Sequence, residues 1–99
     1  MDEKSILAKK WGKEPIMDIA KSLNLSLTET MELALELGLQ NKETLNIGRT
    51  WTTAEEEFLK KHSNELTVRQ ASNLLYRSHY ATYQRVKLLQ LNEMIITKK

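Results

Sequence analysis

The chain resembles itself when it is shifted along its own length, and this repetition constrains the fold more than any other feature of the sequence. A shift of 51 residues places 3–23 on 54–74 without a gap, and one extra residue in the second copy then places 37–39 on 89–91. The matched positions are alike in kind, with paired lysines on paired lysines and apolar residues on apolar residues. The identity is low, so chance similarity between two helical hairpins remains an alternative to duplication.

Helix-start signals divide the second copy into three short helices. Thr52 precedes Glu55 by three residues, the capping-box spacing in which each side chain bonds a free backbone amide of the other residue. We therefore expect the first helix to begin near residue 53. Thr67 and Ser78 are the next predicted N-caps, because hydroxyl side chains accept hydrogen bonds from amides at a helix start. Only a short turn separates the last two helices, which predicts a helix-turn-helix.

The first copy carries equivalent signals. Pro15 fits the first position of a helix, where a missing amide hydrogen is tolerated. Ser26 and Glu29 repeat the capping-box spacing, and Gly38 is expected to end the helix that follows. No stretch alternates between apolar and polar residues over a useful length, so the sequence predicts an all-α protein. The ending NEMIITKK could add a short extended piece.

The predicted architecture is two tandem three-helix helix-turn-helix units, and whether they share a core is left open. A degenerate unit with an acidic third helix is expected over 1–39, and the second unit over 51–91, with 92–99 as a tail. Residues 40–50 contain asparagine, glycine and charged residues without a clear periodicity. We interpret them as a linker that can dock on either unit.

Composition argues against several classes of protein. The absence of cysteine excludes disulfides and thiolate metal sites, and no stretch approaches the roughly 20 apolar residues of a membrane span. The N-terminal residues lack the apolar run of a secretory signal, so we expect a cytoplasmic protein without a membrane partner. Neither histidine has a metal-ligand spacing, and no glycine-rich phosphate loop exists, so we expect no metal, no cofactor and no enzyme activity.

Charge is distributed unevenly along the chain. Residues 1–48 hold six lysines against eight acidic residues, a net charge of −2. Residues 49–99 hold nine lysines and arginines against five glutamates, a net charge of +4. The two halves are therefore expected to contact different partners.

The third helix of the second copy gathers polar and aromatic residues on one side. On a wheel of about 100° per residue, Tyr80, Tyr83, Gln84 and Lys87 lie opposite the packing side, with His79 at the exposed start. Glutamine and lysine can donate to base edges, and tyrosine and lysine can contact sugar and phosphate, as in a helix that enters the DNA major groove. Any solvent-facing helix carries lysine and glutamine, so the composition alone leaves an ordinary surface equally open.

Cations near this helix are predicted to contact the phosphate backbone. Arg77 and Ser78 occupy the turn before the helix, where a phosphate is most easily anchored. Arg49, Lys60 and Lys61 are secondary candidates. Together with the helix face they form the predicted binding site for double-stranded DNA.

Arg85 falls among the packing positions of the same helix. An unpaired buried charge is prohibitively costly, so this arginine needs a carboxylate partner. The acidic first helix of the second copy offers Glu55, Glu56 or Glu57. We predict a structural ion pair from Arg85 to Glu55 or Glu56 rather than a contact with DNA.

A longer pattern connects these residues. It begins W-T-x-x-E-E-x-F-L at Trp51 and continues A-x-x-L-x-x-R-S-x-x-A-T-x-x-R-x-x-x-L-Q-L from Ala71. Over residues 50–91 it resembles the Myb/SANT-like helix-turn-helix module of small bacterial and phage DNA-binding proteins. The chain departs from the family pattern at three positions, where that pattern has an apolar residue, valine and glycine: Gln70, Thr82 and Gln90.

The resemblance implies roles for individual residues. By this likeness Trp51 is a core anchor, Arg85 pairs with the glutamates of the first helix, and the third helix reads double-stranded DNA. The chain is then expected to be a small transcriptional regulator of bacterial or phage type. A single module of this size buries little DNA surface, so tight specific binding would require a second reader from a homodimer or a partner.

The third helix of the first copy differs from its counterpart. Glu29, Glu32 and Glu36 lie on one stripe within about 60° of the wheel, and DNA repels such a stripe. The rest of this helix is apolar over more of its circumference than a three-helix unit needs. Two interpretations stay open: the helix packs on the second unit, or it binds a protein. The second would make the chain a phage-type inhibitor or adaptor of a host protein.

Overall fold

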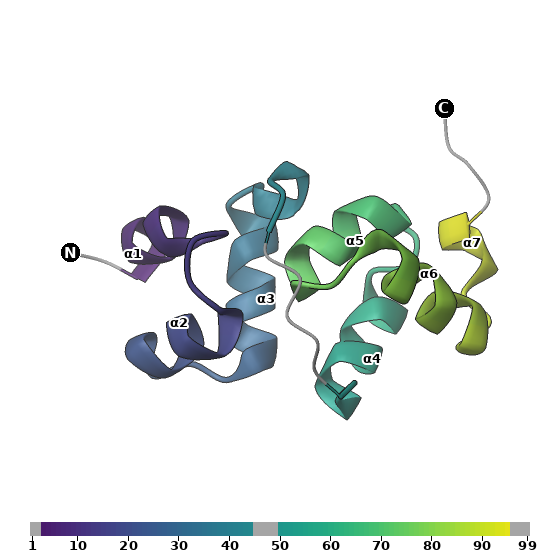
Figure 1. Ribbon diagram of the computed structural model, residues 1–99, viewed down its shortest axis with the longest axis horizontal. Helices are drawn as coiled ribbons and strands as arrows, with labels where there is room; N and C mark the ends of the chain where they lie inside the picture. Colours follow the sequence, from purple (N-terminus) through teal and green to yellow (C-terminus); the bar gives the residue numbers. More distant parts are fainter. Residues whose placement is uncertain (1–2, 45–49, 96–99) are drawn as a thin grey trace.

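The computed structural model describes residues 3–44 and 50–95 of the 99-residue chain. These residues are all-α, as the sequence predicted, and they include no β-strand (Figure 1). In chain order the helices are α1 (Glu3–Lys10), α2 (Ile16–Leu23), α3 (Leu27–Glu36), the 3-10 helix η1 (Leu39–Asn41), α4 (Thr53–Lys61), α5 (Val68–Leu75), α6 (His79–Leu88) and α7 (Asn92–Ile95).

Hydroxyl side chains cap the helices where the sequence predicted them. Ser26 and Thr52 each form a reciprocal capping box with a glutamate three residues further on. Pro15 corrects an expectation, because its ψ of 144° is extended and it therefore precedes α2 instead of forming its first turn. The predicted N-caps that the structure confirms are Ser26, Thr52, Thr67 and Ser78.

The two halves have matching local structure over 16–38 and 68–90. α2 and α5 each have eight residues, and α3 and α6 each have ten. Gly38 and Gln90 both adopt positive φ, at 77° and 61°, just after the third helix of each half. The structural shift is 52 residues, one more than the shift of 51 that the sequence comparison gave for 3–23 and 54–74, so the extra residue of the second half lies before α5. Duplication itself stays a prediction.

One hydrophobic core joins both halves. α3 packs against α1 and α2 of its own half and against α4 and α5 of the other half (Figure 1). Met31 and Ala34 of α3 are completely buried within a cluster that also holds Phe58 and Leu74. The wide apolar circumference of α3 is therefore covered by the second half of the chain, as the first of the two interpretations predicted.

A second contact ties the start of the chain to the turn between α5 and α6. Tyr76 is the C-cap of α5 and has a left-handed backbone with φ of 55°. Its phenol oxygen accepts a hydrogen bond of 2.5 Å from the Gly12 amide, and its ring meets the Trp11 ring edge-on at 5.0 Å. Burial raises the pKa of the Tyr76 hydroxyl, although the Gly12 hydrogen bond opposes that effect. The turn before α6 is thus held partly by the first half.

The predicted linker and tail acquire structure of their own. The Asn73 side chain donates to the Gln40 carbonyl at 2.8 Å, and the Thr44 hydroxyl donates to the Asn73 carbonyl at 3.0 Å, so the start of the linker docks on α5. Residues 92–95 of the predicted tail form α7 instead of an extended piece, and Met94 packs into the core. Among the described residues no helix is long and apolar enough to cross a membrane.

Candidate nucleic-acid interface

The side of α6 that faces solvent carries most of the residues predicted to read DNA. His79, Tyr80, Gln84 and Lys87 are exposed, and Tyr83 is half-buried against the core. The Lys87 ammonium lies 5.7 Å from the centroid of the Tyr83 ring, within the range of a cation–π contact. The structure therefore brings these five predicted residues together on one short helix, with Tyr83 at the edge of the exposed face.

Ser78 has a structural role at the start of this helix. Its hydroxyl accepts a hydrogen bond of 3.0 Å from the Ala81 amide, and its carbonyl accepts one of 2.9 Å from the Thr82 hydroxyl. Thr82 is completely buried where the Myb/SANT-like pattern has valine, and this bond satisfies its hydroxyl. Ser78 thus sets the start of α6, and its predicted contact with phosphate stays a prediction.

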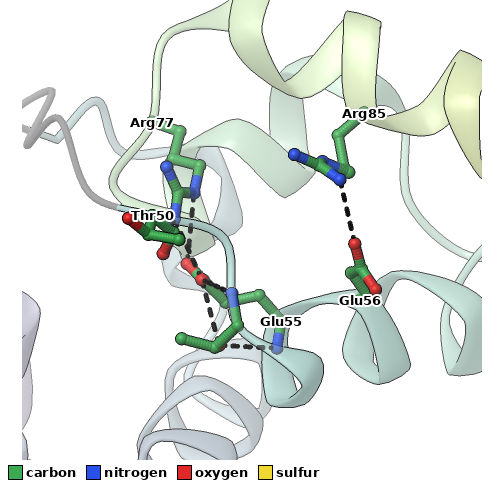
Figure 2. A network of polar contacts seen from close by, with 6 residues as sticks. Thr50, Glu55, Glu56, Arg77 and Arg85 are labelled. Atoms are coloured by element: carbon green, nitrogen blue, oxygen red, sulfur yellow. Dashed lines mark hydrogen bonds and ion pairs between the residues drawn. The ribbon is translucent and has the colours of Figure 1, made fainter.

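Arg77 does not lie where the sequence analysis expected it. Its side chain is only 4% exposed, and its guanidinium donates to the completely buried Glu55 carboxylate at 2.9 and 3.2 Å. It also donates to the Thr50 carbonyl at 3.1 Å (Figure 2). The guanidinium carbon lies 4.0 Å from the centroid of the Trp51 ring. The prediction that Arg77 anchors a phosphate is wrong, because its donors face an internal carboxylate.

Arg85 forms the predicted structural ion pair, with Glu56 as its partner. The distance from Nη1 to the Glu56 carboxylate is 3.1 Å, and Figure 2 shows this pair beside the Arg77 network. The side chains are 27% and 29% exposed, so the pair lies at the edge of the core. The alternative partner, Glu55, is taken by Arg77. Each of the two arginines thus pairs with a different glutamate at the start of α4.

Trp51 links the two arginines. It is half-buried against the core, and the Arg77 and Arg85 guanidinium carbons lie 4.0 and 5.1 Å from its ring centroid. A planar guanidinium over an indole ring is the favourable geometry of a cation–π contact. Trp51 therefore packs both on the hydrophobic core and against the two arginines that pair with glutamates of α4.

The other predicted cations have different surroundings. Lys60 is exposed, whereas the Lys61 ammonium lies 3.1 Å from the Glu32 carboxylate of α3. Arg49 lies outside the described residues. Arg69 was missed by the sequence analysis, although it is exposed in the first turn of α5. It lines a hollow of about 390 Å³ together with His79 and Tyr83, so it stands beside the start of α6.

The acidic stripe of α3 makes internal contacts. Glu32 accepts hydrogen bonds from His62 at 3.0 Å and from Lys61, and Glu36 pairs with Lys4 at 3.0 Å. Glu29 completes the capping box of its own helix. Burial alone would raise the pKa of Glu32, but the bonds from His62 and Lys61 outweigh it and lower that pKa. Glu32 thus joins α3 of the first half to the end of α4 in the second half through hydrogen bonds.

The lowered pKa of Glu32 predicts that the stability of the protein depends on pH. A carboxylate with a lowered pKa stabilises the folded state above its unfolded value of about 4.5, and loses that contribution as the pH falls through the lowered folded value. Glu32→Gln is expected to lower the free energy of unfolding by about 1 kcal/mol or less near neutral pH, because the carboxylate is partly exposed to solvent. The difference from wild type should shrink below about pH 4.5, as measured by urea unfolding between pH 6 and pH 3.

Glu57→Gln is the matched control, because Glu57 is an exposed glutamate on α4. A surface carboxylate of this kind contributes little to stability. A constant difference between wild type and Glu32→Gln over the whole pH range would contradict the role given to the ionised carboxylate.

Comparisons with family models, with curated proteins and with solved structures give no match to this chain. The likeness of residues 50–91 to the Myb/SANT-like module stays a prediction from the sequence. Within residues 3–44 and 50–95, no group of acidic, histidine or cysteine side chains could hold a metal ion.

Proposed function

We propose that the protein binds double-stranded DNA by inserting α6 into the major groove, and that it acts as a small transcriptional regulator of bacterial or phage type. The observation that carries this proposal is the solvent face of α6, where Tyr80, Gln84 and Lys87 stand exposed on a helix that follows a tight turn. An α-helix with its side chains is about 10–12 Å in diameter, and the major groove is about 12 Å wide, so α6 fits the groove.

The setting of α6 supports the proposal. The Arg77–Glu55 pair, the Ser78 cap and the Tyr76 contact hold both the turn and the start of the helix. A recognition element on a rigid support loses little conformational entropy on binding. These contacts therefore favour α6 as an element that presents its side chains to a partner.

Exposed cationic side chains at both ends of α6 are suitable for contacting the phosphates of DNA. Arg69 stands beside the start of the helix, and Lys87 lies in its last turn. We propose that both contact phosphates, with Arg69 taking the role that Arg77 cannot fill. Because one helix buries little DNA surface, tight and specific binding would need two copies of the chain or a partner protein.

A salt-dependent gel shift tests the proposal. Wild-type protein is expected to bind a random-sequence duplex at low salt and to release it as salt rises, because phosphate contacts displace counterions. Lys87→Glu and Arg69→Glu should each weaken binding to every sequence and lower the salt slope by about 1. Lys21→Glu is the matched control, because it makes the same change of charge at an exposed position of α2.

Two results would refute DNA binding through α6. One is the absence of any shift at low salt by folded protein. The other is equal weakening by Lys21→Glu and Lys87→Glu, which would mean that only overall charge matters.

The alternative function, a protein-binding stripe at Glu29, Glu32 and Glu36, gains little support, because each of these carboxylates has a partner within the chain.

A further inference from the structure

Two of the most exposed large apolar side chains of the described residues lie on α6. Tyr80 is 71% exposed and Leu88 is 67% exposed, and the third such residue, Met17 on α2, is 47% exposed. A single exposed leucine is ordinary on a protein surface. A leucine and a tyrosine exposed on the same ten-residue helix, beside two polar residues suited to DNA, are a more specific arrangement.

These side chains form one strip along the helix. At about 100° per residue, Tyr80, Gln84, Lys87 and Leu88 fall within an arc of about 100°. Tyr80 and Leu88 stand about 12 Å apart along the helix axis, with Gln84 midway between them. Base pairs stack about 3.4 Å apart, so the strip spans three or four of them.

The chemistry of the strip matches one class of base pair. The thymine 5-methyl group is the apolar feature of the base edges in the major groove, and apolar side chains pack against it. Glutamine can bond both N6 and N7 of adenine. We infer that Leu88 and Tyr80 contact thymine methyl groups on either side of an adenine read by Gln84, so that the target is an A·T-rich site. This inference rests on the proposed function and names its substrate class.

Removing the methyl groups from the DNA tests the inference directly. The probes are a short duplex of alternating A and T and the same duplex with uracil in place of thymine, which keeps every hydrogen-bonding group of the base edges. Wild-type protein is expected to bind the uracil duplex about fourfold more weakly for each methyl group that it contacts. In Leu88→Ala the ratio of the two Kd values should fall towards one.

Met17→Ala is the matched control, because it removes an exposed apolar side chain from the other half. It should keep the wild-type preference for thymine. Circular dichroism checks that Leu88→Ala is folded. A second pair of probes, a G·C duplex with cytosine or with 5-methylcytosine, adds a methyl group to the same groove and should strengthen wild-type binding.

The outcomes separate the inference from the proposed function. Equal binding of thymine and uracil duplexes by wild type overturns the inference and leaves DNA binding intact. A preference for thymine that survives in Leu88→Ala overturns the role of Leu88. No binding of either duplex at low salt refutes the proposed function itself. Self-association of the free protein that Leu88→Ala abolishes would make the strip a protein interface and overturn the inference.

Discussion

Replacing Arg77 with alanine is expected to lower the free energy of unfolding by about 3–5 kcal/mol, because the Glu55 carboxylate would stay buried without the guanidinium. Both side chains are almost completely buried, and the guanidinium also bonds the Thr50 carbonyl. Domains of this size have about 5–15 kcal/mol of stability in total, so the variant should be near its unfolding threshold. Urea unfolding followed by circular dichroism measures the change.

Arg85→Ala provides the comparison, because it removes an arginine that pairs with the same acidic helix. The Arg85–Glu56 pair is partly exposed, so its loss should cost about 1 kcal/mol or less. The double variant Arg77→Met with Glu55→Gln should recover part of the stability, because it removes the buried charge together with its partner. Equal losses in Arg77→Ala and Arg85→Ala would contradict the assignment of Arg77 as the main brace.

Trp11→Ala is the second change expected to have a large effect, with a loss of about 3–5 kcal/mol. Trp11 is completely buried and packs edge-on against Tyr76 of the other half. Its removal leaves a cavity between the start of the chain and the turn before α6. Because one core joins both halves, the variant should still unfold in a single transition, only at a lower urea concentration.

The remaining tryptophan makes this result measurable. Trp51 is the only other tryptophan of the chain, so its fluorescence reports on the second half while circular dichroism reports on all helices. The two transitions should coincide in Trp11→Ala. Tyr76→Phe, which loses only the hydrogen bond from Gly12, should cost about 0.5–1.5 kcal/mol. A Trp51 transition unaffected by Trp11→Ala would show that the halves unfold independently.

The helices were predictable because their start signals are local. Each cap accepts a hydrogen bond from the backbone amide three residues further on, so spacing in the sequence is enough to identify Ser26, Thr52, Thr67 and Ser78. The exposed face of α6 followed from helical periodicity for the same reason. The short helices and their exposed faces could therefore be predicted without knowledge of the tertiary structure.

The roles of the two arginines were harder to predict. A helical wheel places Arg85 correctly because it lies inside α6, and the expected pair with a glutamate of α4 was confirmed for Glu56. Arg77 precedes the helix, directly after the left-handed backbone of Tyr76, and its side chain pairs with Glu55 of another helix. A helical wheel cannot predict the direction of a side chain that lies outside the helix. The partner of Lys61 could not be predicted for a related reason, because Glu32 comes from a distant helix.

The contact of Trp11 and Gly12 with Tyr76 also determines how the chain can be shortened. A fragment that keeps only residues 50–91 contains every proposed DNA contact on α6, yet it would bare the ring of Tyr76 and the surfaces of α4 and α5 that α3 covers. Failure of that fragment to bind DNA would then report its unfolding. The residues that contact DNA should therefore be mapped by point substitutions in the whole chain. A deletion would not distinguish residues that contact DNA from residues that only stabilise the fold.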